Sequence, residues 1–94
     1  MRIRLSQVFF MRFRNNYYNR SIKMDNIEKI FAEKLKELRL EKKLSTVALG
    51  KVLNVSNSTI CRWEKCEIIP TITHLYNIAL YFGVSADYLI GLEN

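Results

Sequence analysis

The sequence has 94 residues, of which 49% are hydrophobic and 26% are charged, a balance typical of a folded globular chain. A single domain of this size has a modest core and little room for an elaborate catalytic cavity, which excludes most multi-step enzyme architectures. Three glycines and one proline are too few for the tight turns of a β-sandwich or barrel, and no apolar run is long enough to span a membrane. The composition therefore favours one all-α domain.

The net charge of +6 belongs to the start of the chain. Residues 1–24 contain six of the 15 basic side chains and none of the nine acids, so the nine basic and nine acidic groups of residues 25–94 cancel. The basic character is therefore no evidence that residues 25–94 bind nucleic acid. That claim must depend on where individual charges lie.

Residues 1–24 mix arginine with aromatic and aliphatic side chains and show no helical period. They could be a basic arm that follows DNA phosphates or lies on an anionic membrane, or a disordered terminus. They could also be non-native, because Arg20-Ser21 can be encoded by a ribosome-binding sequence shortly before the Met24 codon. We favour the disordered and non-native interpretations over the arm, and the arm over a membrane anchor. The functional domain is then residues 25–94.

From Asp25 onward, residues that cap helices alternate with short apolar runs of helical period. Asp25 is followed three residues later by Glu28, which is the spacing of a capping box. Four later residues each precede such a run and are predicted N-caps: Ser45, Ser56, Thr71 and Ser85. Pro70 and Gly83 separate and end the later helices. We predict five helices, at residues 26–42, 46–53, 57–65, 72–82 and 86–91.

Residues 46–65 are predicted to form two short helices around a tight connection. Gly50 is small where the second helix must approach the first, and Asn54 tolerates positive φ at the turn. The apolar residues are spaced to meet between the helices: Leu49, Leu53, Val55, Ile60 and Trp63. The outer face of the second helix is small and polar and ends in cations: Asn57, Ser58, Cys61, Arg62 and Lys65. This pattern indicates a helix-turn-helix.

An ordered set of short motifs runs through residues 27–92: Leu38-Arg39, Leu44-Ser45, Val55-Ser56, Ser58-Thr59-Ile60, Trp63-Glu64, Pro70, Ile78-Ala79 and Gly83-Val84-Ser85-Ala86-Asp87-Tyr88-Leu89. With the helix-turn-helix, this set resembles the lambda-repressor/Cro-like (XRE-type) family of bacterial and phage transcriptional regulators. The resemblance implies a five-helix lambda-repressor-like fold. It also implies double-stranded DNA as the partner, read by the second helix of the motif in the major groove.

The resemblance further implies roles for single residues. Asn57, Ser58 and Arg62 are the candidates for base edges. Arg62 can fork onto guanine, and Asn57 can pair with adenine. Phosphate contacts are expected from Thr46, Thr59 and Lys65. Arg39 and Glu64 match a pair that links the first helix to the end of the third, and we interpret them as structural.

Three departures from the family's pattern predict modest DNA affinity. Thr46 stands where glutamine is usual, which shortens the reach to phosphate. Cys66 replaces the usual glycine after the recognition helix, so a left-handed conformation there would cost about 1 kcal/mol or more. Residues 67–69 are Glu-Ile-Ile in a loop that often carries lysine or arginine against the DNA backbone.

The other candidates for chemistry favour structural interpretations. His74 is expected to be exposed on a helix, without metal-ligand neighbours, and Cys61 and Cys66 are spaced so that neither a disulfide nor a metal pair is favoured. Cys61 could be a redox-sensitive thiol, but a tolerated small side chain is the favoured interpretation. The aromatic residues expected in the core or at an interface are Phe31, Trp63, Phe82 and Tyr88. No catalytic triad can be assembled, so we expect no enzyme, cofactor, metal or small-molecule substrate.

A single small recognition helix rarely covers enough base pairs for regulatory specificity, so we expect a homodimer on a two-fold operator. Late apolar residues exceed what one helix face can bury, and they form the expected dimer interface: Tyr81, Tyr88, Ile90 and Leu92. With no credible signal peptide or disulfide framework, the predicted function is that of a cytoplasmic, sequence-specific repressor. The competing class is a protein-interaction module, such as an antitoxin-like or adaptor protein. Arg62 and Lys65 favour DNA, whereas Glu67 and the zero charge of residues 25–94 favour the alternative.

Overall fold

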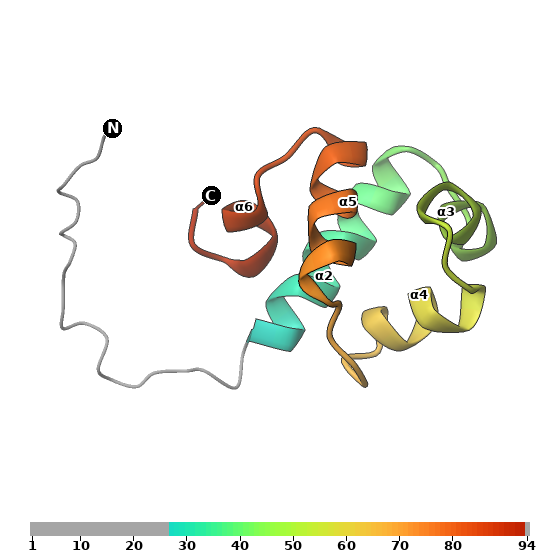
Figure 1. Cartoon of the computed structure of the whole chain (residues 1–94), viewed down its shortest axis with the longest axis horizontal. Helices are drawn as coiled ribbons and strands as arrows, with labels where there is room; N and C mark the ends of the chain where they lie inside the picture. Colours follow the sequence, from blue (N-terminus) through green and yellow to red (C-terminus); the bar gives the residue numbers. More distant parts are fainter. Residues whose placement is uncertain (1–26, 94) are drawn as a thin grey trace, which may run out of the picture.

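The computed structural model describes residues 27–93, and this part of the chain consists of helices joined by short connections. The helices are α2 (Ile27–Glu41), α3 (Thr46–Leu53), α4 (Asn57–Glu64), α5 (Ile72–Phe82) and α6 (Ala86–Ile90) (Figure 1). The predicted all-α fold is confirmed, and the predicted helix ends differ from the observed ones by at most one residue. The cap predicted at Asp25 and the tail of residues 1–24 lie outside the described residues.

The four predicted N-caps are observed, which explains why the later helices begin where they do. Each cap residue has an extended backbone, and its hydroxyl accepts a hydrogen bond from the N–H three residues later. The pairs are Ser45 with Ala48, Ser56 with Thr59, Thr71 with His74 and Ser85 with Tyr88, at 3.0 to 3.2 Å. Each bond satisfies a donor that has no partner within its helix, and such a cap stabilises by about 1 kcal/mol.

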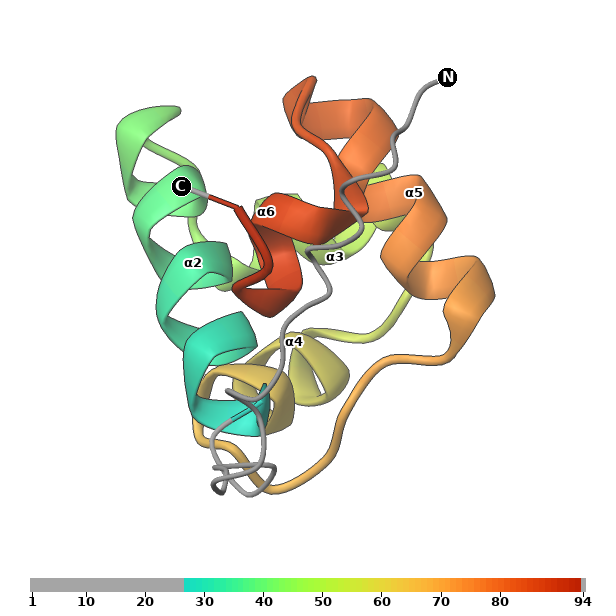
Figure 2. The ribbon, with the colours of Figure 1, turned by 90° about the vertical axis from the view of Figure 1, so that its left-hand side faces the viewer.

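The core is formed by side chains from all five helices, with α4 packed against α2 and α3, and α6 packed beside α2 (Figure 2). Trp63 of α4 is only 1% exposed and meets Phe31 of α2 edge to face, with ring centroids 6.2 Å apart. The fully buried aliphatic side chains come from every helix and surround this pair: Leu35, Leu49, Ile60, Ile78 and Leu89. Because each such side chain contributes about 1.5 to 3 kcal/mol when buried, this cluster holds α4 against the rest of the domain.

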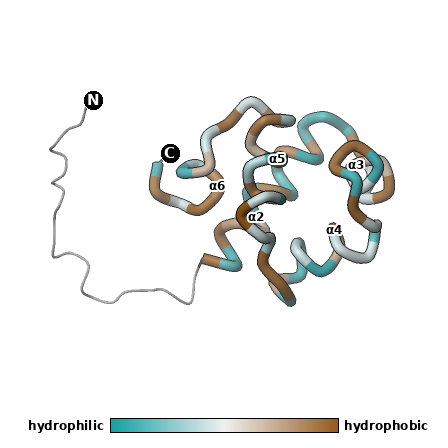
Figure 3. Tube along the Cα trace, viewed as in Figure 1, coloured by the Kyte–Doolittle hydropathy of each residue, from teal (hydrophilic) through white to brown (hydrophobic). Residues whose placement is uncertain are grey.

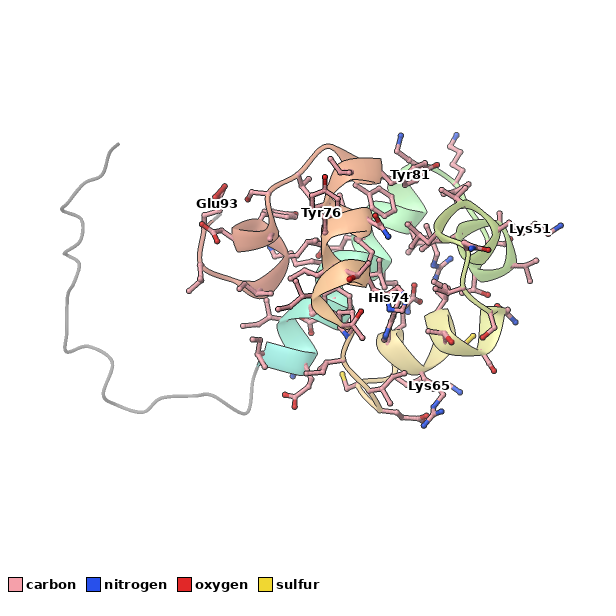
Figure 4. The ribbon with its side chains drawn as sticks, viewed as in Figure 1. Lys51, Lys65, His74, Tyr76, Tyr81 and Glu93 are labelled. Atoms are coloured by element: carbon pink, nitrogen blue, oxygen red, sulfur yellow. The ribbon has the colours of Figure 1, made fainter. Side chains whose placement is uncertain are left out.

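The prediction that His74 is exposed was wrong. It is half-buried rather than exposed, and its ring lies edge-on to Trp63 with centroids 5.3 Å apart. Its place on α5 brings it over the end of α4, as Figure 4 shows. The expectation failed because the polarity of histidine said nothing about the aromatic partner that a different helix supplies.

Candidate nucleic-acid interface

The turn between α3 and α4 places the two helices of the motif in close contact. A Cβ on Gly50 would lie 2.8 Å from the carbonyl oxygen of Val55, closer than real contacts allow, so only glycine fits there. Asn54 ends α3 with φ of 60°, the left-handed conformation that asparagine tolerates better than most residues. The N–H of Val55 then donates to the carbonyl of Gly50 at 2.9 Å. These local constraints set the angle at which α4 leaves α3.

The outer face of α4 is polar and exposed. Ile60 and Trp63 point into the core, whereas Asn57, Ser58 and Arg62 are exposed on the other side of the helix. Lys65 follows at the end of α4 and projects away from the domain (Figure 4). Figure 3 shows α4 mostly in the pale and teal colours of polar residues. The structure therefore brings all three predicted base-contacting residues onto one exposed surface.

The start of α4 carries donors suited to an anion. The hydroxyl of Ser56 accepts from the Thr59 N–H and also lies 2.9 Å from the Thr59 hydroxyl, so the two side chains hold each other. First-turn N–H groups have no partner within their own helix, and the helix dipole adds partial positive charge there. Thr59 is half-buried, and so is Thr46 at the start of α3. Both predicted phosphate-contacting threonines thus stand at helix starts with limited exposure.

A buried ion pair fixes the far end of α4. Arg39 of α2 donates from Nε and Nη2 to the two carboxylate oxygens of Glu64, at 2.7 and 2.9 Å, and from Nη1 to the carbonyl of Leu44 at 3.0 Å. The side chains are 11% and 9% exposed. The hydrogen bonds to Glu64 raise the pKa of Arg39 above its ordinary value. This geometry joins α2, the start of the motif and the end of α4, and it keeps both groups away from a ligand at the outer face.

Two contacts at the outer face were not predicted. Arg62 Nε lies 3.5 Å from Glu67 Oε1, and the two side chains are 56% and 52% exposed. The Cys61 thiol donates to Asn57 Oδ1 at 3.8 Å, one helical turn away. The i, i+4 spacing of Asn57 and Cys61 could have indicated the second contact, because such residues are neighbours on a helix. The first depends on the chain reversal after α4. The sequence had indicated a left-handed residue at Cys66, but not that the reversal brings Glu67 beside Arg62.

The chain reversal is made at Cys66. Its φ is 64°, so the residue adopts the left-handed conformation in which the family usually has glycine. The N–H of Glu67 donates to the carbonyl of Arg62 at 2.9 Å, and that of Cys66 to the carbonyl of Trp63 at 3.2 Å. This is the hydrogen-bond pattern of a Schellman cap, and it carries Glu67 back beside Arg62.

The predicted dimer residues, here called the C-terminal apolar set (Tyr81, Tyr88, Ile90 and Leu92), lie mainly along α2. Lys42 Nζ lies 5.3 Å from the centre of the Tyr81 ring, and Lys34 Nζ lies 4.5 Å from that of Tyr88. Ile90 lines an apolar groove of about 200 Å³ beside the start of α2. Within this set only Leu92, which is 73% exposed, is largely free of the domain.

Within residues 27–93, no three His, Cys, Asp or Glu side chains are arranged to hold a metal ion, and Cys61 and Cys66 are free thiols. None of the helices in this range is both long enough and apolar enough to cross a membrane.

Comparison with known proteins identifies the family. A family model described as "Helix-turn-helix" (HTH_3) matches residues 35–89, which include α3, α4 and the Arg39–Glu64 pair. The chain belongs to this helix-turn-helix family. The resemblance to lambda-repressor/Cro-like regulators that the sequence motifs indicated is confirmed.

Two curated relatives are transcriptional regulators. The chain is 36% identical over 63 residues to the HTH-type transcriptional activator BcrR of Enterococcus faecalis, covering 67% of this chain and 31% of that protein. It is 33% identical over 61 residues to Repressor protein C2 of Salmonella phage P22, covering 65% and 28%. The chain thus spans about a third of the length of these relatives. A crystal structure of the P22 c2 repressor with a synthetic operator has a TM-score of 0.63 at 32% identity, covering 67% of this chain and 96% of that chain.

One structural neighbour is an enzyme. Hydroxypropylphosphonic acid epoxidase from S. wedmorenis matches with a TM-score of 0.64 at 33% identity. The match covers 69% of this chain but only 35% of the epoxidase chain. The likeness therefore concerns a helix-turn-helix portion that two kinds of protein share, and fold alone does not transfer an activity.

Proposed function

We propose that this chain is a sequence-specific DNA-binding repressor that inserts α4 into the major groove. The observation that carries the proposal is the exposed polar face of α4, held rigidly between Gly50 at one end and the buried Arg39–Glu64 pair at the other. Rigid presentation matters because base readout requires side chains at fixed positions. The likeness to a repressor solved with a synthetic operator supports the same function.

Within this proposal the exposed residues divide into two groups. Asn57, Ser58 and Arg62 read base edges, with Arg62 directed at guanine and Asn57 at adenine. Phosphate contacts come from Thr46, Thr59 and Lys65. Arg62 must leave Glu67 to reach a base, and an acidic side chain beside the DNA opposes phosphate binding. The proposal therefore includes a modest affinity.

The operator-bound form is proposed to be a homodimer that contacts two half-sites about one helical turn apart. The C-terminal apolar set makes the contact between the two copies. Leu92 supplies the most exposed apolar side chain of this set. We propose repression rather than activation, because a bound dimer that covers a promoter needs no further contact with another protein. The proposed role needs no catalysis, cofactor or small-molecule substrate, and it is exercised in the cytoplasm, where the DNA lies.

Selection of bound sites from random duplexes, followed by titration of the selected site, tests the proposal. We expect a two-fold consensus bound more tightly than random DNA, and repression of a reporter whose promoter contains it. Arg62→Ala should flatten the consensus at one base pair in each half-site, and Lys65→Ala should keep the consensus and weaken every sequence alike. An unenriched pool, or enrichment unchanged by Arg62→Ala, would remove α4 as the reader.

The second candidate function is a protein-interaction module with weak or no DNA binding. The Arg62–Glu67 ion pair favours it, because Glu67 partly neutralises a cation on the proposed DNA face. A salt titration with random duplex separates the two functions. A DNA-binding surface loses affinity steeply as salt rises, with a slope set by the number of phosphates contacted, whereas the module shows no such slope.

The domain boundary is proposed to lie at Met24. The buried cluster and the Arg39–Glu64 pair, which hold α4 in place, are both formed by side chains within residues 27–93. A chain that begins at Met24 should therefore form the same helices within residues 27–93 as the full chain. It should also rank DNA sequences in the same order. It should lose at most a non-specific, salt-sensitive component of binding, because residues 1–24 carry the whole net charge. Circular dichroism and competition binding measure the two quantities, and an altered ranking of sequences would show that residues 1–24 take part in readout.

A further inference from the structure

Helix α5 has apolar residues on its outer side as well as on its inner side. Ile78 is buried on the inner side, whereas Ile72, Tyr76 and Leu80 are 85%, 62% and 63% exposed. These three residues, here called the α5 stripe, recur every four positions and so lie along one side of the helix. A helix that is apolar on both sides is normally covered on both sides.

The α5 stripe borders an open apolar groove of about 470 Å³. The groove runs from α5 to the start of α6 and is lined by Leu75, Ala79, Val84 and Ala86 as well as the stripe itself. At its end, a Cβ added to Gly83 would meet nothing within 4 Å, so the surface is open there. A contiguous apolar surface of this kind usually marks an interaction site in a small protein.

The α5 stripe shares no residue with the proposed DNA face or with the C-terminal apolar set, and Leu75 lies between the stripe's groove and the groove that Ile90 lines. His74 leaves α5 toward Trp63 of α4, whereas Tyr76 leaves the helix on another side (Figure 4). Tyr88 lies against Lys34 of α2, and Tyr81 lies against Lys42, which follows the end of α2. A partner on the stripe therefore leaves α4 free.

We propose that the α5 stripe is a self-association surface on which a second copy of this chain packs its own α5 in antiparallel orientation. The stripe is symmetric about Tyr76, with Ile72 four residues before it and Leu80 four residues after it. Around a two-fold axis at Tyr76, Ile72 meets the partner's Leu80, and Tyr76 meets the partner's Tyr76. This equal spacing is compatible with the two-fold symmetry of an isologous interface.

The lack of charged side chains on α5 also favours a second copy over a charged partner. α5 has the sequence ITHLYNIALYF, which contains no acidic residue and no lysine or arginine. Two such faces meet without like-charge repulsion and without burying an unpaired charge, whereas an acidic or basic partner would find nothing to pair with on α5. One helix face is small beside the about 800 Å² per partner of a standard interface, so the contact should be weak and concentration-dependent.

Sedimentation velocity of the full chain without DNA tests the proposal. In the variant Ile90→Asp with Leu92→Asp, which disables the C-terminal apolar set, we expect dimers to persist as concentration rises. Adding Ile72→Asp and Tyr76→Asp should raise the dissociation constant at least tenfold. Leu40→Asp is the matched control, because Leu40 is 54% exposed on α2 and lies outside both surfaces. If the half-buried Ile90 proves necessary for folding, Leu92→Asp alone is used in place of Ile90→Asp with Leu92→Asp.

The outcomes for the two surfaces are distinguishable. If Ile90→Asp with Leu92→Asp yields a folded monomer at all concentrations, the α5 stripe does not associate and the inference is wrong. If Ile72→Asp with Tyr76→Asp alone yields a monomer, the stripe is the main contact and the proposed C-terminal interface is wrong. A monomeric wild-type chain whose stripe is shielded from a paramagnetic co-solute would mean that residues 1–26 occupy it, which also overturns the inference.

Cross-linking tests the orientation. In a chain with Cys61→Ala and Cys66→Gly, we expect Tyr76→Cys to form an intermolecular disulfide under mild oxidation. The variants Ile72→Cys and Leu80→Cys should each fail to cross-link alone. They should cross-link when the two variants are mixed, because Ile72 of one copy faces Leu80 of the other. A parallel or unrelated contact would reverse or abolish this pattern.

Discussion

Two arginine–glutamate pairs meet α4, one on its inner side and one on its outer side, and they use the same chemical groups to different ends. Arg39 and Glu64 are bidentate at 2.7 and 2.9 Å and nearly buried. Arg62 and Glu67 are 3.5 Å apart and more than half exposed. A buried pair cannot lose one member without leaving an unsatisfied charge, whereas water readily solvates each member of the exposed pair. The inner pair is therefore a support for α4, and the outer pair is able to open when a ligand arrives.

The largest expected effect comes from breaking the inner pair. Glu64→Ala leaves the Arg39 guanidinium buried with only the Leu44 carbonyl as partner, and it should lower the free energy of unfolding by about 3 to 5 kcal/mol. Guanidinium denaturation followed by circular dichroism measures the loss. Glu67→Ala is the control from the outer pair and should change stability by less than about 1 kcal/mol. Equal losses in the two variants would erase the contrast between the pairs.

The next effect concerns binding at the outer face. Arg62→Ala should weaken binding to the selected site by about 1 to 3 kcal/mol and relax the preference at one base pair, because a forked contact to guanine is lost. Lys65→Ala should leave the preference intact and reduce the slope of log affinity against log salt by about 1. Fluorescence anisotropy at several salt concentrations gives both numbers. Identical behaviour of the two variants would mean that Arg62 contacts phosphate only.

A smaller effect is expected at the residue that brings the outer pair together. Cys66→Gly removes the strain of a left-handed side-chain-bearing residue and should stabilise the domain by about 1 kcal/mol. Cys66→Ala is the matched control, because it removes the thiol but keeps the Cβ, and it should leave stability nearly unchanged. Thermal melts of the three chains report the difference. A stabilisation by alanine as large as that by glycine would assign the effect to the thiol.

The smallest effect on stability is expected from Glu67→Gln, which keeps the size of the side chain and removes its charge. The free energy of unfolding should fall by no more than about 0.5 kcal/mol, because the pair is exposed. DNA affinity should rise several-fold at low salt, since Arg62 is released and an acid near the phosphates is gone. Unchanged affinity at low salt would show that Glu67 lies away from the DNA.

Local chemistry is the part of this protein that the sequence by itself determined. A serine or threonine cap acts on an N–H three residues away, and Asn54 and Gly83 end helices through their own backbone conformations. Such interactions need no distant partner, so the helix boundaries could be predicted to within a residue. The same holds for the polar face of α4, because the 3.6-residue period places Asn57, Ser58 and Arg62 opposite the apolar positions.

Contacts between distant segments were decided only by the tertiary structure. His74 of α5 meets Trp63 of α4, and Arg39 of α2 meets Glu64 at the end of α4, through packing that no periodicity describes. The α5 stripe is the clearest example. Ile72 and Ile78 are equally apolar and lie on the same helix, yet one is 85% exposed and the other is fully buried. Period and hydrophobicity tell which residues share a side of a helix, but whether that side is covered depends on which other helices pack there, and the packing of the whole domain determines that.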